Sequence, residues 1–294
     1  MLLGVTSALP AAAAIVAGGD GTQNTTAVGT VSQFNNVGRL NGASGIYLGD
    51  GVVLTAYHVG PGTITFASGS FTAVSGSELR LQDPIDSTPT DLVLFRIGAA
   101  PALPSLTIAS TTPLVGTSAV LAGNGRNRAE SLTYYDVSGT HPDFTWTETS
   151  NPATAEASGY KWAADNTLRW GSNVTENASR VGAAPGPTVN VNARFGNVRS
   201  ILTDFDNVLN EGQAAGGDSG GAMFDTAGTL IGLMHAIGPF EDQPANTSIF
   251  GNVTYAADLS YYRSQIVAYV PEPSSALFIA GMCAVIALRR RRAR

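Results

Sequence analysis

The chain has 294 residues, of which 44% are hydrophobic and 13% charged, and its formal net charge is −6. This composition supplies a large core and excludes intrinsic disorder, which needs low hydrophobicity and high charge. Five of the 16 basic residues are arginines within residues 289–294, so residues 1–270 hold 11 basic and 21 acidic residues and a net charge of −10. Such an acidic body argues against nucleic-acid binding. The single cysteine, Cys283, lies in the tail, so residues 1–270 form no disulfide among themselves.

The N-terminal segment is apolar and rich in alanine, with an alanine run at residues 11–14. This pattern predicts a signal peptide over residues 1–17, although no positive charge stands near Met1. The alternative is an ordered apolar strand at the N-terminus.

Residues 18–104 alternate short apolar runs with turn residues, which predicts a first all-β unit. The prolines of residues 99–104 would interrupt a strand, so we expect the connection to a second unit there. The best strand candidates in the first unit are residues 28–31, 45–48 and 51–55, with a hairpin turn at 49–51, and residues 64–66, 71–74 and 92–97 continue the pattern.

Residues 105–257 predict a second all-β unit that opens with a buried-strand pattern at 117–123. Its middle part, residues 124–195, is polar and contains all three tryptophans. We expect loops and short hairpins there, whose aromatic side chains either cover the core or recognise a polymeric ligand or partner. His141 in this region has no second ligand at metal spacing, which indicates a surface loop residue rather than a metal site.

The spacing of apolar residues predicts a helix over residues 258–269. Asp258 is a suitable N-cap, because its carboxylate can accept a hydrogen bond from the first turn. One face of this helix carries Leu259, Tyr262, Ile266 and Tyr269.

The segment of residues 216–221 reads Gly-Gly-Asp-Ser-Gly-Gly and holds one hydroxyl between pairs of glycines. Serine is a weak nucleophile unless a base takes its proton. Glycines allow a positive φ and close substrate approach, and such a turn can aim backbone N–H groups at an oxyanion. An ordinary turn between strands has the same composition, so a base and an acid are needed elsewhere in the chain.

Both groups have candidates upstream of Ser219. His58 closes an apolar run, and Asp91 opens the apolar segment that reads Asp-Leu-Val-Leu-Phe. Asp83 and Asp86 are rival acids, but both lie in a proline-containing turn. The chain order of the candidate base, acid and nucleophile is therefore His58, Asp91, Ser219.

These three motifs together resemble the trypsin/chymotrypsin-like serine peptidase family. Residues 55–58 read Thr-Ala-Tyr-His, which is similar to the family's Thr/Ser-Ala-Ala-His motif with tyrosine as a departure. Residues 91–94 and 217–221 resemble its aspartate and nucleophile motifs. The resemblance implies an all-β fold of two six-stranded antiparallel β-barrels, at 18–104 and 105–257, and a C-terminal helix at 258–269.

The same resemblance implies the roles of the site residues. Ser219 would be the nucleophile, His58 the general base and Asp91 the acid that orients the imidazole. The backbone N–H groups of Gly217 and Ser219 would bind the oxyanion, and neither a metal nor an organic cofactor is needed.

The position of the primary substrate pocket also follows from the resemblance. Gln213, six residues before the nucleophile, would stand at its floor and His235 at its wall. Because residue 213 is not aspartate, a preference for Arg or Lys is not expected. His235 either accepts an acidic side chain, as in glutamate-specific members, or is a structural histidine.

Activation in many family members uses a new N-terminus whose ammonium pairs with the aspartate before the nucleophile. Here that aspartate is Asp218, and residues 15–19 resemble the activating start with one alanine inserted. Cleavage before Ile15 would create this terminus. In the alternative, local hydrogen bonds hold Asp218 and no switch exists.

The tail begins with Pro271, Glu272 and Pro273, continues with an apolar run at 276–288 and ends in arginines. Residues 271–294 thus resemble the PEP-CTERM sorting signal of Gram-negative bacteria that export polysaccharide. The resemblance implies a transient membrane anchor, a short helix that an exosortase removes before the protein reaches the cell surface or the medium. A permanent anchor is the alternative.

The resulting prediction is an exported serine endopeptidase that hydrolyses polypeptide substrates through an acyl-enzyme. Two alternatives use the same fold without catalysis: a silent surface protein and an adhesive matrix protein that binds exopolysaccharide. An α/β-hydrolase esterase fits less well, because its acid and base follow the serine in sequence.

Overall fold

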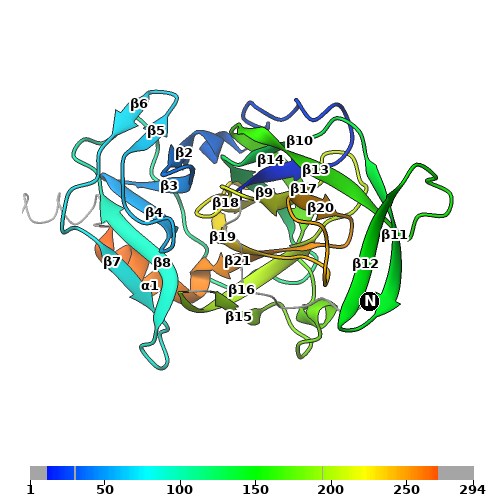
Figure 1. Cartoon of the computed structure of the whole chain (residues 1–294). Helices are drawn as coiled ribbons and strands as arrows, with labels where there is room; N and C mark the ends of the chain where they lie inside the picture. Colours follow the sequence, from blue (N-terminus) through cyan, green and yellow to red (C-terminus); the bar gives the residue numbers. More distant parts are fainter. Residues whose placement is uncertain (1–11, 30, 194, 271–294) are drawn as a thin grey trace, which may run out of the picture.

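The computed structural model describes residues 12–29, 31–193 and 195–270 (Figure 1). Two large antiparallel sheets lie side by side, with the N-terminal one at the left of the view and the C-terminal one in the centre. The prediction of an all-β chain with a C-terminal helix is confirmed. The expected tail helix and the PEP segment lie outside the described residues.

The first sheet has the order β6-β5-β2-β3-β4-β8-β7. We expected six strands, and the structure has seven, because residues 72–78 separate β6 from β7 and the two form different strands. A bridge between Ala73 and Ile97 joins this chain to the end of β8, so the sheet closes on itself. The strands are β2 (Val37–Leu40), β3 (Ala43–Gly49), β4 (Val52–Ala56), β5 (Ile64–Phe66), β6 (Gly69–Phe71), β7 (Leu79–Gln82) and β8 (Pro89–Arg96), preceded by the 3₁₀ helix η1 (Ser32–Asn36).

The second sheet has the order β14-β9-β18-β19-β21-β16-β15, again with seven strands instead of six. All its pairs are antiparallel. The strands are β9 (Ser118–Gly123), β14 (Arg169–Val174), β15 (Val189–Ala193), β16 (Gly196–Asp204), β18 (Ala222–Asp225), β19 (Leu230–Gly238) and β21 (Val253–Asp258), and the 3₁₀ helix η2 (Ala178–Val181) precedes β15.

Residues 124–195 differ from the loops and short hairpins that we expected. Besides β14 and β15, they supply four strands of a separate five-stranded sheet, whose β11–β12 hairpin projects at the right of Figure 1. Its polar residues mark strand faces exposed to solvent rather than loops. The five strands are β10 (Arg126–Arg128), β11 (Thr133–Thr140), β12 (Asp143–Thr149), β13 (Ala157–Asn166) and β20 (Thr247–Ile249).

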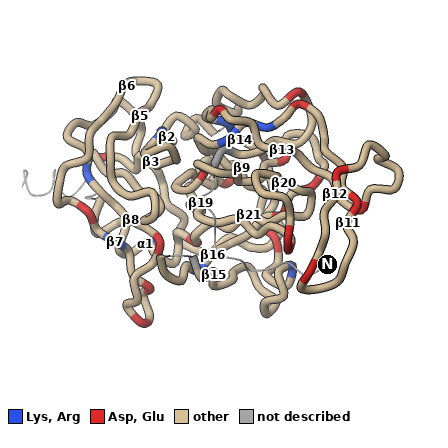
Figure 2. Tube along the Cα trace, viewed as in Figure 1, with Lys and Arg blue, Asp and Glu red and all other residues tan. Residues whose placement is uncertain are grey.

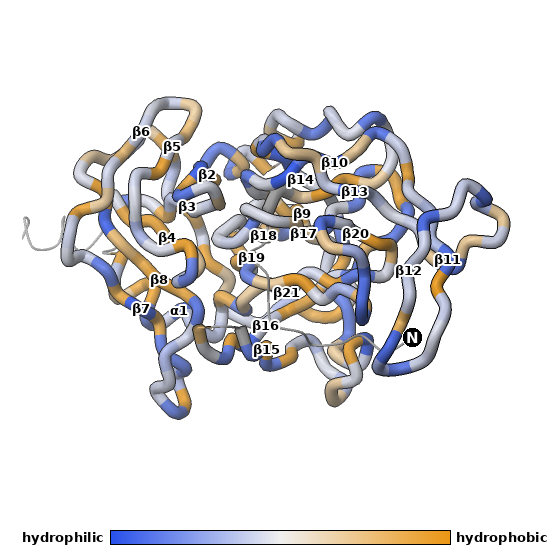
Figure 3. The backbone as a smooth tube through the Cα atoms, in the orientation of Figure 1, coloured by the Kyte–Doolittle hydropathy of each residue, from blue (hydrophilic) through white to orange (hydrophobic). Residues whose placement is uncertain are grey.

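The largest core cluster joins both main sheets. It includes Leu54 and Leu92 of the first sheet together with Leu233 of the second, all fully buried. Hydrophobic segments follow the inner strands of both sheets in Figure 3. This shared core holds the two sheets, and the loops between them, in a fixed relation.

The terminal helix α1 (Leu259–Tyr269) confirms the predicted helix and its cap. The Asp258 carboxylate accepts a hydrogen bond from Ser260 N, and Leu259, Tyr262 and Ile266 are buried. Within the described ranges, no helix is both long and apolar enough to cross a membrane.

The described part of the N-terminal segment is an ordered strand. Residues Ala12–Val16 form β1, which pairs with β17 (Gly212–Ala215), and Ile15 is 1% exposed. The Arg128 guanidinium donates to the carbonyls of Val16 and Gly19 and stacks 3.9 Å over the Tyr160 ring. A signal peptide cut after residue 17 would remove this buried strand. Residues 1–11 lie outside the described part of the chain, and the signal peptide over residues 1–17 stays a prediction.

Candidate active site

The pairing of β4 with β8 brings the predicted base and acid together. Ala56, the last residue of β4, pairs with Leu92 of β8, and His58 follows β4 directly. Asp91 precedes Leu92, and its backbone oxygen accepts a hydrogen bond from Tyr57 N at 3.0 Å. Two neighbouring strands therefore position both side chains.

Ser219 reaches the same point from the second sheet, in the turn between β17 and β18. Its Oγ lies 2.7 Å from His58 Nε2, and His58 Nδ1 lies 2.7 Å from Asp91 Oδ2. The other oxygen of Asp91 accepts a hydrogen bond from His58 N at 2.9 Å. Asp91 is 1% exposed, and a carboxylate accepts hydrogen bonds, so the imidazole Nδ1 of His58 is the donor. In the neutral ring, Nε2 is then left to accept a hydrogen bond from the Ser219 hydroxyl.

The rival acids lie elsewhere. One Asp83 oxygen accepts hydrogen bonds from Ile85 N and the Tyr261 hydroxyl. Asp86 is exposed, and hydrogen bonds from the Thr88 hydroxyl and Thr88 N lower the pKa of its carboxyl. Among the three candidate acids, only Asp91 touches the histidine.

Ser44 of β3 ties the nucleophile turn to the first sheet, a role that sequence reasoning missed. Its Oγ donates to Gly217 O at 2.7 Å and accepts from Asn124 N at 2.8 Å. Its backbone N donates to Ser219 O at 3.0 Å. The fully buried Ser44 therefore holds the backbone carbonyls of Gly217 and Ser219, on both sides of Asp218.

Gly220 explains why the motif needs glycine after the serine. Its φ is +83°, and a Cβ there would lie 2.1 Å from Ser44 O and 2.2 Å from Thr55 Oγ1. Any side chain would push the two sheets apart at the site.

Chain comparisons agree with this geometry. The family model for the trypsin-like peptidase domain matches residues 43–233. The chain belongs to this trypsin-like peptidase family. The model for the PEP-CTERM protein-sorting motif matches residues 270–292, so both resemblances are confirmed. A comparison with curated proteins finds no match.

Solved structures support the fold of the peptidase domain. A variant of human heparin binding protein is 14% identical, covers 85% of this chain and 98% of its own, and has a TM-score of 0.51. A second variant of that protein is 15% identical, with coverages of 85% and 97% and a TM-score of 0.50. A Glu endopeptidase in complex with MPD is 14% identical, with coverages of 87% and 100% and a TM-score of 0.47. At these identities, the first two similarities establish the fold alone.

Asp218 of the peptidase domain is fully buried, and burial raises the pKa of its carboxyl well above the usual range. One oxygen accepts a hydrogen bond from Ala215 N at 3.0 Å, and the other has no hydrogen-bond partner among the described residues. Ile15 lies inside β1 opposite Gln213 and is not a chain terminus here. This arrangement corresponds to the alternative in which local hydrogen bonds hold Asp218, and use of the activation switch stays a prediction.

An aromatic group beside the triad was not expected from the sequence. The Phe195 ring stacks on His58 with centroids 6.2 Å apart, and it meets the Tyr57 ring edge to face at 5.8 Å. The Arg80 guanidinium lies over the Tyr57 ring, 3.8 Å from its centroid. Tyr57, the departure from the family motif, therefore packs between Phe195 and Arg80. Phe195 lies in a turn that is distant from Tyr57 in sequence.

The predicted pocket residues lie behind the surface. Gln213 is 1% exposed and donates from its side chain to Val253 O at 3.3 Å. His235 is fully buried, its Nε2 lies 2.8 Å from Ser200 Oγ, and burial lowers its pKa to about 4. The imidazole is therefore neutral at physiological pH. Their roles in a substrate pocket stay predictions.

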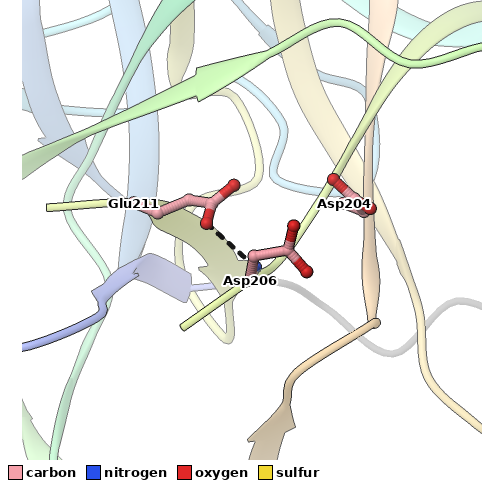
Figure 4. A group of neighbouring side chains, drawn as sticks. All are labelled: Asp204, Asp206 and Glu211. Atoms are coloured by element: carbon pink, nitrogen blue, oxygen red, sulfur yellow. Dashed lines mark hydrogen bonds between the residues drawn. The ribbon is translucent and has the colours of Figure 1, made fainter. Parts of the chain in front are cut away.

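Three carboxylates gather where β16 ends and β17 begins (Figure 4). Asp204, Asp206 and Glu211 each have an oxygen within 4.8 Å of the others. Glu211 accepts a hydrogen bond from Asp206 N at 3.0 Å, and Asp204 pairs with Arg180 at 3.1 Å. Burial, followed by the Asp206 charge, raises the pKa of Glu211 to about 7.

Proposed function

We propose that this protein is a serine endopeptidase whose catalytic triad is Ser219, His58 and Asp91. The observation that carries the proposal is the unbroken contact from Ser219 Oγ through the imidazole to Asp91, with 2.7 Å at each step. Packing alone does not require a buried carboxylate, a half-enclosed histidine and a serine in line. The membership in the trypsin-like peptidase family supports the same activity.

The proposed reaction begins when Ser219 Oγ attacks a peptide carbonyl carbon while its proton passes to His58 Nε2. The resulting imidazolium is stabilised by Asp91, which keeps its negative charge. Collapse of the tetrahedral intermediate breaks the C–N bond, and Nε2 returns the proton to the leaving amine. Water then repeats the sequence on the acyl-enzyme, so no metal or organic cofactor is required.

The negative oxygen of the intermediate is proposed to bind between Gly217 N and Ser219 N. Gly217 has a φ of +104°, a conformation that suits glycine, and its carbonyl is held by Ser44. A fixed donor pair of this kind needs no reorganisation during the reaction, which is the source of its catalytic effect.

The tail supports a proposal on location. We propose that the chain is exported and held by residues 276–288 until an exosortase-type enzyme acts at Pro271, Glu272 and Pro273. The match of the PEP-CTERM sorting motif to residues 270–292 supports this proposal. The peptidase would then act at the cell surface or in the medium of a Gram-negative bacterium.

A labelled fluorophosphonate probe tests the catalytic proposal. Wild type should label at Ser219, whereas Ser219→Ala should not label and His58→Ala should label far more slowly. Asp91→Asn should lower kcat by about 10⁴-fold, because the amide favours the wrong imidazole tautomer. If folded wild type neither labels nor cleaves a peptide library, the enzyme proposal fails and the alternative of a silent or adhesive surface protein, with exopolysaccharide as its ligand, replaces it.

A further inference from the structure

A cleft of about 410 Å³ opens beside the reactive serine, and one cation stands in its wall. Ser219 and His58 lie at one end, and residues 41–43, from the β2–β3 turn and the start of β3, form a side. The other side comes from the five-stranded sheet and includes Arg126 and Trp162. A substrate chain that reaches Ser219 therefore passes between the first main sheet and the additional sheet.

Arg126 differs from the neighbouring Arg128 and Arg169 in being exposed to solvent. It forms no ion pair within the described residues, and its Nη1 donates a hydrogen bond to Ala164 O. By contrast, Arg128 and Arg169 are buried and donate to backbone carbonyls around β1 and Gln23. The bond to Ala164 orients the exposed guanidinium and leaves further N–H donors for a ligand.

The other polar groups of the cleft do not compensate this charge. No aspartate or glutamate is among the residues that line the cleft. The Asn41 side chain donates to the carbonyls of Val59 and Gly60, and the Asn166 side chain donates to Asn124 O at 3.2 Å. The amide donors of Asn41 and Asn166 are thus committed to the protein, and Arg126 is the one Lys or Arg side chain among the residues that line the cleft.

The positive charge of Arg126 contrasts with the net negative charge of the rest of the molecule. Residues 1–270 carry a net charge of −10, and acidic residues are spread over the outer loops in Figure 2. An acidic surface repels carboxylates at long range, so a carboxylate has a favourable place only where a cation is supplied locally. Guanidinium binds a carboxylate with two parallel hydrogen bonds, which makes it a selective partner.

We propose that Arg126 binds a carboxylate of the peptide substrate close to the scissile bond and thereby sets part of the cleavage preference. This inference rests on the proposed function. The ligand is a peptide carboxylate, from either an Asp or Glu side chain or a free C-terminus. A basic side chain at the same place meets the guanidinium and is rejected.

Peptide libraries with one varied position test the preference. Wild type should cleave peptides with Glu about ten-fold faster, in kcat/KM, than those with the neutral isostere Gln at one position near the scissile bond. Arg126→Gln should bring that ratio near one, and Arg126→Glu should favour Lys instead. Arg126→Lys should keep part of the preference. Amidated peptides with an internal Glu and neutral peptides with a free C-terminus separate the two carboxylate sources.

Arg39→Gln is the matched control, because Arg39 is exposed on β2, outside the cleft lining, and the substitution removes the same charge. Its Glu-to-Gln ratio should equal that of wild type. A ratio near one in wild type, or an unchanged ratio in Arg126→Gln, overturns the assignment while the peptidase proposal stands.

Binding to the inactive Ser219→Ala variant gives a second readout that needs no turnover. Because Trp162 lines the cleft, its fluorescence should report the titration of a Glu-containing peptide. The affinity for this peptide should fall about ten-fold when Arg126→Gln is added to Ser219→Ala. Added salt should weaken binding to Ser219→Ala but not to the double variant, which lacks the guanidinium. If wild type cleaves no peptide but Arg126→Gln still lowers the affinity, the carboxylate site stands although the peptidase proposal fails. Equal affinities with and without Arg126→Gln overturn the carboxylate site.

Discussion

The buried carboxyl of Glu211 should make the stability of the fold depend on pH. Its side chain is 9% exposed, and its backbone oxygen accepts a hydrogen bond from Ala17 N, next to β1. Burial raises its pKa from 4.5 to about 7. The substitution Glu211→Gln keeps the shape and the acceptor for Asp206 N while removing the ionisable group.

The direction of this pH dependence follows from whether the folded or the unfolded state loses the Glu211 proton first. The folded-state pKa lies above the unfolded value, so the unfolded state ionises first, and stability falls as pH rises from 4.5 to about 7. One pKa unit corresponds to about 1.4 kcal/mol, so the penalty is about 1 kcal/mol at pH 5 and about 3 kcal/mol at pH 8. Glu211→Gln should therefore stabilise the protein by about 2 kcal/mol more at pH 8 than at pH 5.

Urea unfolding of Ser219→Ala protein, with and without Glu211→Gln, measures this difference in the absence of self-digestion. A chelator belongs in the buffer, because a cation between the carboxylates of Figure 4 would favour their ionised forms. Glu78→Gln, at an exposed position, is the matched control. A stabilisation that is equal at both pH values, or larger at pH 5, would refute the reasoning.

Four further predictions concern the nucleophile turn and the two ends of the chain. Ser44→Ala should lower kcat about 10- to 100-fold with little change in KM, because the Gly217 carbonyl loses its donor; an unchanged kcat contradicts this. Asp218→Asn should keep activity and fold at pH 8, since burial favours the uncharged carboxyl, and loss of activity with the fold intact would indicate an ionised partner pair. N-terminal sequencing of the exported protein should find residues 12–16 retained, and a start after residue 17 would exclude β1 from the mature fold. Mass spectrometry should place the mature C-terminus near residues 271–273, and an intact tail would refute sorting-signal removal.

The sequence by itself determined the family, the candidate triad and the terminal helix. Each rests on a short segment whose chemistry is local. The glycines around Ser219 must permit a tight turn, Asp91 must open an apolar strand, and Asp258 must cap a helix with one apolar face. Such requirements are readable without a partner segment, and the structure brings all three triad residues within hydrogen-bond distance.

Tertiary structure alone decided the rest, because sheet pairing depends on segments far apart in the chain. The apolar residues 12–17 suit both a signal peptide and a strand, and the pairing of residues 12–16 with the distant strand β17 is visible only in the tertiary structure. Ser44 reads as an ordinary strand residue until Gly217 and Asn124 arrive at its hydroxyl. Arg126 becomes a cleft residue only when the additional sheet faces the β2–β3 turn, since its surroundings are contributed by side chains from separate strands.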